Sequence, residues 1–171
     1  MIESDRSPVI TSRRLTLRRF DLGDAAQLVA LDADERVRRY IIDDPVETLA
    51  QALTLIDYLQ GVYPTGLGIW HASDDTGAFI GHFSLMPIDD ADVAIGVRLH
   101  PEAWGKFYAL EGGRALCRYA FGTQGLERIV GYCNPENRVV DLLLRRLRFR
   151  NEGPVERDGR TVTRYVRPRD P

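Results

Sequence analysis

A predicted strand runs directly into a glycine-bearing loop and a helix between Leu99 and Ala109, in the sequence LHPEAWGKFYA. The first backbone N–H groups of a helix have no partner within the helix, and the helix dipole is positive at that end. Such a loop is an anion site formed by the main chain, and Lys106 adds a positive charge to it. Because many strand-to-helix turns contain one glycine, the segment indicates an α/β arrangement and does not by itself reveal a function.

The patterns on both sides of this loop predict a single mixed α/β domain over residues 1–171, with helices on both faces of the sheet. Apolar stretches between turn signals predict an antiparallel meander just before the loop. Strands are predicted at 15–20, 69–72, 78–86, 93–99, 128–133, around 149 and at 161–166. Helices are predicted at 21–31, 47–59, 106–121 and 137–147, and residues 1–12 are predicted to be a loose arm. The central sheet should therefore have about seven strands.

Charge and cysteine content argue against several classes of function. The chain has 23 Lys and Arg residues against 25 Asp and Glu, whereas nucleic-acid binding normally requires a basic surface. Arginines do cluster at 145–169, and a solvated face is favoured there over a phosphate-binding patch. Cys117 and Cys133 lack the spacing of a metal site, so buried free thiols and no metal are expected.

The N-terminal segment contains no apolar stretch typical of a secretory signal. No apolar run reaches the ~18 residues that a membrane-spanning helix needs. We therefore expect no membrane association, and a cytoplasmic location follows by elimination.

Downstream residues make the loop far more specific. The chain resembles the GCN5-related N-acetyltransferase (GNAT) superfamily, in particular the ribosomal-protein N-terminal alanine acetyltransferases (the RimJ/RimL-like branch). The resemblance covers about residues 11 to 167 and is carried, in order and at the family's spacing, by TSRRLTLR at 11–18, Trp104-Gly105-Lys106, Ala109, Glu111, Tyr119-Ala120-Phe121, Leu126-Glu127-Arg128-Ile129, Asn134-Pro135-Glu136-Asn137, Leu147, Phe149 and Glu152-Gly153.

This resemblance implies a cosubstrate and a place for it. In the family, acetyl-CoA lies between two parallel strands that splay apart, which correspond here to 93–99 and 128–133. Val97, Arg98 and Leu99 would hydrogen-bond the pantetheine arm, and Asn137 matches an asparagine that contacts the cofactor. The pyrophosphate would bind to the loop that contains Trp104, Gly105, Lys106, Phe107 and Tyr108, although packing explains the two aromatic residues Trp104 and Tyr108 equally well.

Several positions depart from the family pattern. Phe107 replaces the second glycine of the phosphate loop, so its side chain must turn away from the phosphates or narrow their space. Val140 and Leu144 stand where relatives carry a serine and a tyrosine that serve proton transfer, and Tyr132 replaces a glutamate that acts as general base. Arg148 replaces a glycine near a helix end, which predicts a different helix end or mild strain.

Three residues are therefore weak candidates for proton transfer. Tyr132 keeps a phenol at the family's base position. Asp92, with Asp89 and Asp90, lies at a predicted hairpin, where a role as base competes with ordinary turn chemistry. His82 lies in a strand and would be a base near neutral pH, but a structural histidine is the more common case.

The predicted function is transfer of an acetyl group from acetyl-CoA to a primary amine by direct attack in a ternary complex. The acceptor would be a protein N-terminus or a small amine, and the residues at 36–65 give no readable code for it. The alternative is a catalytically weakened CoA-binding or regulatory protein with the same fold, for which the substitutions are the evidence. A homodimer is left open.

Overall fold

The computed structural model describes residues 8–63, 66–89 and 91–170. Its α-helices are α1 (Ala25–Asp32), α2 (Glu35–Arg38), α3 (Leu49–Val62), α4 (Tyr108–Arg118) and α5 (Arg138–Arg146). Its strands are β1 (Ile10–Thr11), β2 (Thr16–Arg19), β3 (Gly68–Ser73), β4 (Phe79–Pro87), β5 (Val93–Leu99), β6 (Arg128–Cys133), β7 (Arg150–Arg157) and β8 (Arg160–Pro168). Short helical turns lie at η1 (Leu22–Asp24), η2 (Pro101–Ala103) and η3 (Tyr119–Thr123), the last a π-helix.

All eight strands form one mixed sheet in the order β1-β2-β3-β4-β5-β6-β8-β7. The predicted meander is confirmed, because β3, β4 and β5 pair antiparallel in sequence order. The pair β5–β6 is parallel, while every other pair among the described strands is antiparallel. The count exceeds the predicted seven because Ile10 and Thr11, expected in a loose arm, pair with β2 as β1. The rest of that arm up to residue 7 lies outside the described residues.

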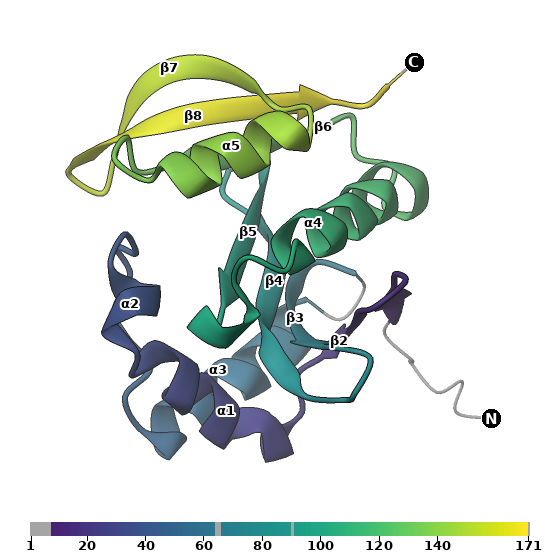
Figure 1. Cartoon of the computed structure of the whole chain (residues 1–171), viewed down its shortest axis with the longest axis vertical. Coiled ribbons are helices and arrows are strands. Elements are labelled where there is room, and N and C mark those ends of the chain that lie inside the picture. Colours follow the sequence, from purple (N-terminus) through teal and green to yellow (C-terminus); the bar gives the residue numbers. More distant parts are fainter. Residues whose placement is uncertain (1–7, 64–65, 90, 171) are drawn as a thin grey trace.

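Helices cover both faces of the sheet, as predicted. On one face, the nearest neighbours of Gly112 in α4 and of Gly131 in β6 are Phe83 of β4 and Leu144 of α5. On the other face, Gln27 of α1 bonds to His71 of β3. Figure 1 shows α1 and α3 at one end of the molecule and α5 with β7 and β8 at the other.

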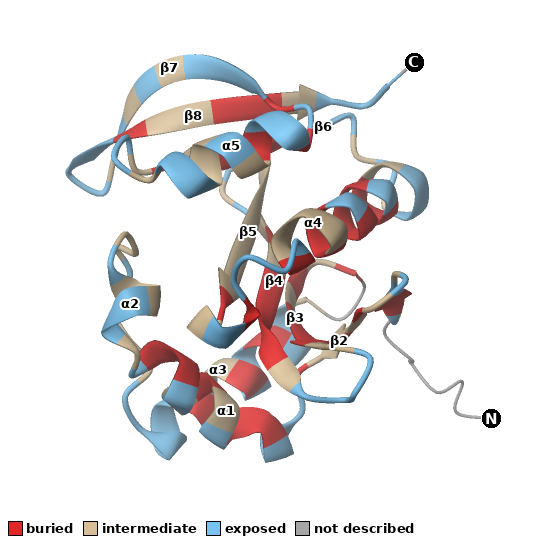
Figure 2. Cartoon of the chain, in the orientation of Figure 1, coloured by how far each residue is buried: buried red, intermediate tan, exposed pale blue. Residues whose placement is uncertain are grey.

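Buried apolar side chains form a main core between the sheet and α4, and a second cluster beneath α1 and α3. Figure 2 shows buried residues concentrated on β4 and on the inner sides of α1 and α4. Cys117 and Cys133 are buried free thiols, as predicted. The two glycines Gly112 and Gly131 permit close helix-to-sheet packing, because a Cβ atom there would lie 2.2 Å from Phe83 and 2.8 Å from Leu144.

The helix predicted at 106–121 differs from the structure at both ends for local reasons. The helix expected from Lys106 begins at Tyr108, because the residue before it has left-handed backbone angles (φ 63°). The stretch expected as one helix to Phe121 ends as the π-helix η3. The helix α2 was not predicted, since four residues are too short to show a periodic pattern. None of the helices in the described residues is long and apolar enough to cross a membrane.

Candidate functional site

The strands β5 and β6 separate almost as soon as they meet. Their register contains one parallel pair, Ala94 with Val130. Beyond it, Val97, Arg98 and Leu99 remain paired with β4 on one side. Since backbone groups alternate between the two sides of a strand, those directed away from β4 face the opening between β5 and β6. An extended ligand can pair with this edge as an added strand would.

The loop after β5 is held to the strand end by a side chain. The indole Nε1 of Trp104 donates a hydrogen bond to the carbonyl oxygen of Leu99 at 3.0 Å. Gly105 has a φ of 74°, and a Cβ atom at this residue would meet nothing within 4 Å. Gly105 and Lys106 are both exposed. The loop therefore offers open space next to the first N–H groups of α4, which is the arrangement that binds anions.

The conformation of Phe107 shows whether its side chain narrows the phosphate loop. Its φ of 63° lies in the left-handed region, which a non-glycine residue enters at a cost of about 1–2 kcal/mol. The residue is 63% exposed, so the ring lies in solvent. Phe107 thus has a backbone conformation that favours glycine, while its ring leaves the loop open. Arg148, the other non-glycine residue at a glycine position, is also left-handed, with a φ of 66°.

An ion pair fastens the N-terminal segment to this loop. Arg14 bonds through Nε and Nη2 to Glu111 of α4 at 2.7 Å, and its Nη2 also donates to the carbonyl of Lys106 at 3.0 Å. Its guanidinium lies 4.6 Å from the ring centre of Tyr108. Burial opposes ionisation of Glu111, but hydrogen bonds from Ser12 and Arg14 hold the pKa of its carboxyl below the ordinary value. Sequence analysis used Glu111 and the segment 11–18 only as part of the resemblance and did not predict the contact between Arg14 and Glu111, because the two residues are 97 positions apart.

Asn137 is the N-cap residue of α5. Its Oδ1 accepts a hydrogen bond from the N–H of Val140 at 3.2 Å. The Cys133 thiol at the end of β6 donates to the carbonyl oxygens of Asn134 and Asn137. Leu144 is buried against Gly131. The helix therefore begins beside the open end of β6, and its side chains at positions 140 and 144 are the apolar Val140 and Leu144.

The two candidate bases Asp92 and His82 lie in surroundings that disfavour the role. Asp92 is buried and bonds to Arg128 at 2.6 Å and to Arg164 at 2.7 Å. Burial alone would raise the pKa of this carboxyl, but the two arginines lower it below the ordinary value. Burial lowers the pKa of His82 to about 3, so the imidazole is neutral at physiological pH and a poor proton acceptor. We assign a catalytic role to neither.

Tyr132 lies on β6 at the splay, and its ring is stacked against the Arg157 guanidinium at 4.1 Å. Its neighbour across the sheet is Arg164. The phenol of Tyr132 therefore has an arginine stacked on its ring and another as its cross-strand partner.

A cluster of four charged residues lies between α1 and the splayed strand β5. Asp32, at the end of α1, bonds to Arg98 of β5 at 2.6 Å and to Arg38 at 3.4 Å. Asp43 bonds to Arg98 at 2.9 Å and to Arg38 at 2.8 Å, which closes a ring of two acids and two bases. The carboxylate of Asp32 also accepts the N–H of Val46 at 2.9 Å. This four-residue ring ties the segment between α2 and α3 to the splayed strand.

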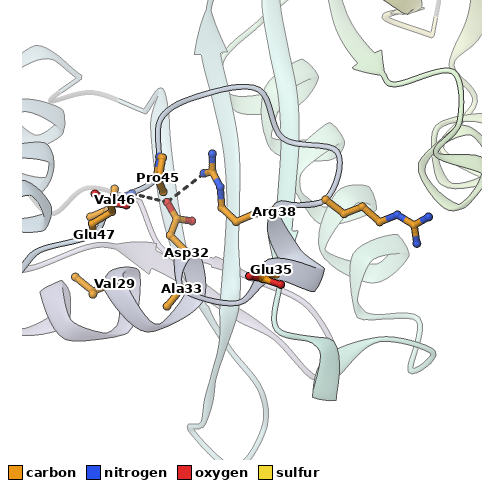
Figure 3. A pocket seen from close by; sticks show the side chains of 9 residues that line it. Val29, Asp32, Ala33, Glu35, Arg38, Pro45, Val46 and Glu47 are labelled. Carbon is orange, nitrogen blue, oxygen red and sulfur yellow. Dashed lines mark hydrogen bonds and ion pairs between the residues drawn. The ribbon is translucent and has the colours of Figure 1, made fainter.

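The ring borders a cavity of about 500 Å³. Figure 3 shows Asp32 and Arg38 on its wall, with Glu35 and Glu47 at its two sides. The remaining lining comes from Val29, Ala33, Arg39, Pro45 and Val46. This volume lies in the range of small-molecule sites. Sequence analysis did not predict this cavity, because the two neighbouring stretches that line it, 29–39 and 45–47, carry no motif for a site.

A sequence model of the acetyltransferase (GNAT) domain matches residues 14–150. The chain belongs to the GNAT acetyltransferase family. One GNAT relative, the uncharacterised N-acetyltransferase p20 of Bacillus licheniformis, is 30% identical over 164 residues, which cover 91% of this chain and 92% of the relative.

Solved GNAT structures share the fold at lower identity. The ribosomal L7/L12 alpha-N-protein acetyltransferase RimL, solved with coenzyme A, superposes with a TM-score of 0.83 at 20% identity, covering 94% of this chain and 98% of that one. A spermidine N-acetyltransferase SpeG variant of Vibrio cholerae superposes with a TM-score of 0.75 at 21% identity, covering 92% and 95%. The expected fold and family are thus confirmed, while these two proteins have very different acceptors.

Proposed function

We propose that the chain transfers an acetyl group from acetyl-CoA to a primary amine, by direct attack of the amine in a ternary complex. The observation that carries this proposal is the splay of β5 from β6 immediately before the Gly105 loop. The open edge would bind the pantetheine arm, and the loop with the first turn of α4 would bind the pyrophosphate. A cytoplasmic location, where the amine and acetyl-CoA would meet, is part of this proposal.

The amine would approach from the face that carries α1, Tyr132 and the four-residue ring. The main contribution to rate would come from holding the two reactants together. A backbone N–H at the splay would polarise the thioester carbonyl as the tetrahedral centre forms. CoA leaves as a thiolate, which is a tolerable leaving group, so Val140 and Leu144 need not prevent turnover. The reaction would depend instead on the amine arriving neutral.

The second candidate is a CoA-binding regulatory protein. Phe107, Val140 and Leu144 favour it, since the loop is strained and two proton-transfer positions are apolar. The exposed ring of Phe107 favours the enzyme, because the ring leaves the loop free.

The test is a titration of the purified chain with CoA, followed by a thiol-release assay with acetyl-CoA and a panel of primary amines. Binding together with amine-dependent thiol release supports the enzyme. Binding without release for any amine would favour the regulatory protein. The absence of CoA binding at millimolar concentration would remove both.

A further inference from the structure

The acceptor face of the splay can be identified from the strand register. Side chains of directly paired residues point to the same face of a sheet, and side chains alternate along each strand. Arg98 points to the α1 face, since it reaches Asp32. Ala94 lies on the same face as Arg98 by alternation, and its partner Val130 places Tyr132 there too. This face is opposite to α4 and α5.

Arg157 reaches the same face from the far edge of the sheet. It is the last residue of β7, before a hairpin turn in which Asp158 and Gly159 have left-handed angles. Arg157 is a half-buried residue, and its guanidinium carbon lies over the ring of Tyr132, 4.1 Å from the ring centre. Stacking on an aromatic ring removes water from one side of the cation and holds it in place.

Two carboxylates that contact Arg164, the cross-strand neighbour of Tyr132, are engaged by arginines other than Arg157. Asp92 is bound by Arg128 and Arg164, and Glu152 is bound by Arg164. Among the residues that the structure describes, no carboxylate forms an ion pair with Arg157. A positioned and partly desolvated guanidinium without an anion is suited to bind a carboxylate on a ligand.

We infer that Arg157 on Tyr132 forms a subsite for a carboxylate carried by the acceptor amine. The inference rests on the proposed function, because it assumes that the amine reacts beside Tyr132. The acceptor class is then a primary amine with a carboxylate a few bonds away, either a free amino acid or a peptide with an acidic residue next to its N-terminus. An amine without an anionic group would leave Arg157 unpaired.

Matched acceptors separate charge from shape. We would compare alanine with alaninamide, and the amidated dipeptides Ala-Asp and Ala-Asn, by the kcat/KM of acetyl transfer. The parent should prefer the carboxylate member of at least one pair by tenfold or more, and which pair shows the preference distinguishes a free amino acid from a peptide. Equal rates within both pairs, or a preference for the amides, would overturn the subsite.

Variants then assign the preference to one side chain. Arg157→Gln should abolish it and Arg157→Lys should retain part of it, with CoA affinity unchanged. Arg146→Gln is the matched control, because Arg146 is an exposed arginine of α5, on the opposite face of the sheet. If Arg157→Gln lowers kcat/KM equally for the acids and for the amides, Arg157 has a packing role only.

A binding measurement decides the subsite without turnover. Propionate carries the carboxylate and lacks the amine, so it should shift the Arg157 Nε–H resonance in the CoA-bound protein, whereas propionamide should not. No propionate-specific shift at Arg157 overturns the inference even if amines are acetylated. A shift in a chain that acetylates no amine would instead leave the subsite standing and count against the proposed enzyme.

Discussion

The two sides of the splay are constructed by different means. On the cofactor side, the groups expected to bind CoA are main-chain atoms of β5, of the Gly105 loop and of the first turn of α4. On the acceptor side, the walls consist of charged side chains that hold one another, with Asp32 and Arg98 at the centre. A backbone site tolerates changes of side chain such as Phe107, whereas a side-chain site changes its specificity with each substitution. We therefore expect the cofactor side of this chain to tolerate substitution better than the acceptor side.

The largest effect should come from the acceptor side. Asp32→Ala would leave Arg98, Arg38 and the Val46 N–H without their buried partner, because the Asp32 side chain is 4% exposed. Breaking a buried ion pair from one side costs about 3–5 kcal/mol, so we expect a loss near the lower end in denaturant unfolding.

The control for this prediction is Asp43→Ala, in the same ring but with a side chain 63% exposed. It should cost no more than about 1 kcal/mol, as surface pairs do. CoA affinity of the folded protein should be unchanged in both variants. Equal losses for the two would mean that the ring does not organise this side of the molecule.

The next effect belongs to the cofactor side. Gly105→Asp places a carboxylate where the pyrophosphate should bind, and we expect CoA affinity to fall about a hundredfold, or about 2.7 kcal/mol. Gly105→Asn is the matched control, since both side chains tolerate left-handed angles and neither would meet a neighbour within 4 Å at Cβ. Gly105→Asn should weaken CoA binding by a few-fold at most. Both affinities are measured by calorimetric titration. A similar loss for both would show that shape, not charge, governs the loop.

The cofactor side was also the more predictable side. The meander, the loop and the two following helices lie within 69–147, and each has a local signal in hydrophobic spacing or glycine placement. Asn137 is at the helix start where the sequence placed it. The left-handed angle at Arg148 corresponds to one of the two outcomes predicted there, mild strain at a helix end, because a glycine at such a position usually permits a left-handed cap.

The acceptor side could not be predicted in this way. Its ring joins Asp32 to Arg98 across 66 residues of chain, and no local pattern records such a pairing. The stack of Arg157 on Tyr132 depends on the β6–β8–β7 strand order, which the sequence did not specify. Asp92 was considered for catalysis without its two arginines, one of which is 72 residues away. Side-chain networks between distant segments are fixed by tertiary structure alone.

Acidic pH should destabilise the acceptor side before the cofactor side, and this effect is smaller than the two above. Burial lowers the pKa of His82 to about 3, and that of His71 is also lowered, first by burial and then by the charge of Arg18. In the unfolded chain the histidine pKa values are near 6.5, so on acidification the unfolded chain binds these protons first. The contribution of the two histidines to the free energy of unfolding is therefore present in full well above pH 6.5 and is lost as the pH falls from about 6.5 toward 3. His82 alone should cost about 1 kcal/mol on going from pH 6.5 to 5.5.

Both histidines face α1 and Phe20, so hydrogen exchange at mildly acidic pH should increase in α1 and α3 before α4 and α5. His82→Gln should reduce the slope of unfolding free energy against pH in that window. An unchanged slope would show that carboxylates alone determine the acid response.

The smallest effect concerns Phe107. Because this residue is left-handed and not helical, glycine removes strain of about 1–2 kcal/mol and gives back part of it as backbone entropy. Phe107→Gly should therefore stabilise the protein by up to about 1 kcal/mol in thermal unfolding. Arg148→Gly is the matched control, since it relieves the same backbone strain at a helix end away from the loop.

If the chain is an enzyme whose loop already has its working shape, both variants should bind CoA within about threefold of the parent, because the Phe107 ring already lies in solvent. A tenfold tightening for Phe107→Gly alone, or about 1.4 kcal/mol, would mean that the ring obstructs the loop. That outcome would favour the regulatory protein, and it would also break the contrast drawn above, since a backbone site would then depend on one side chain.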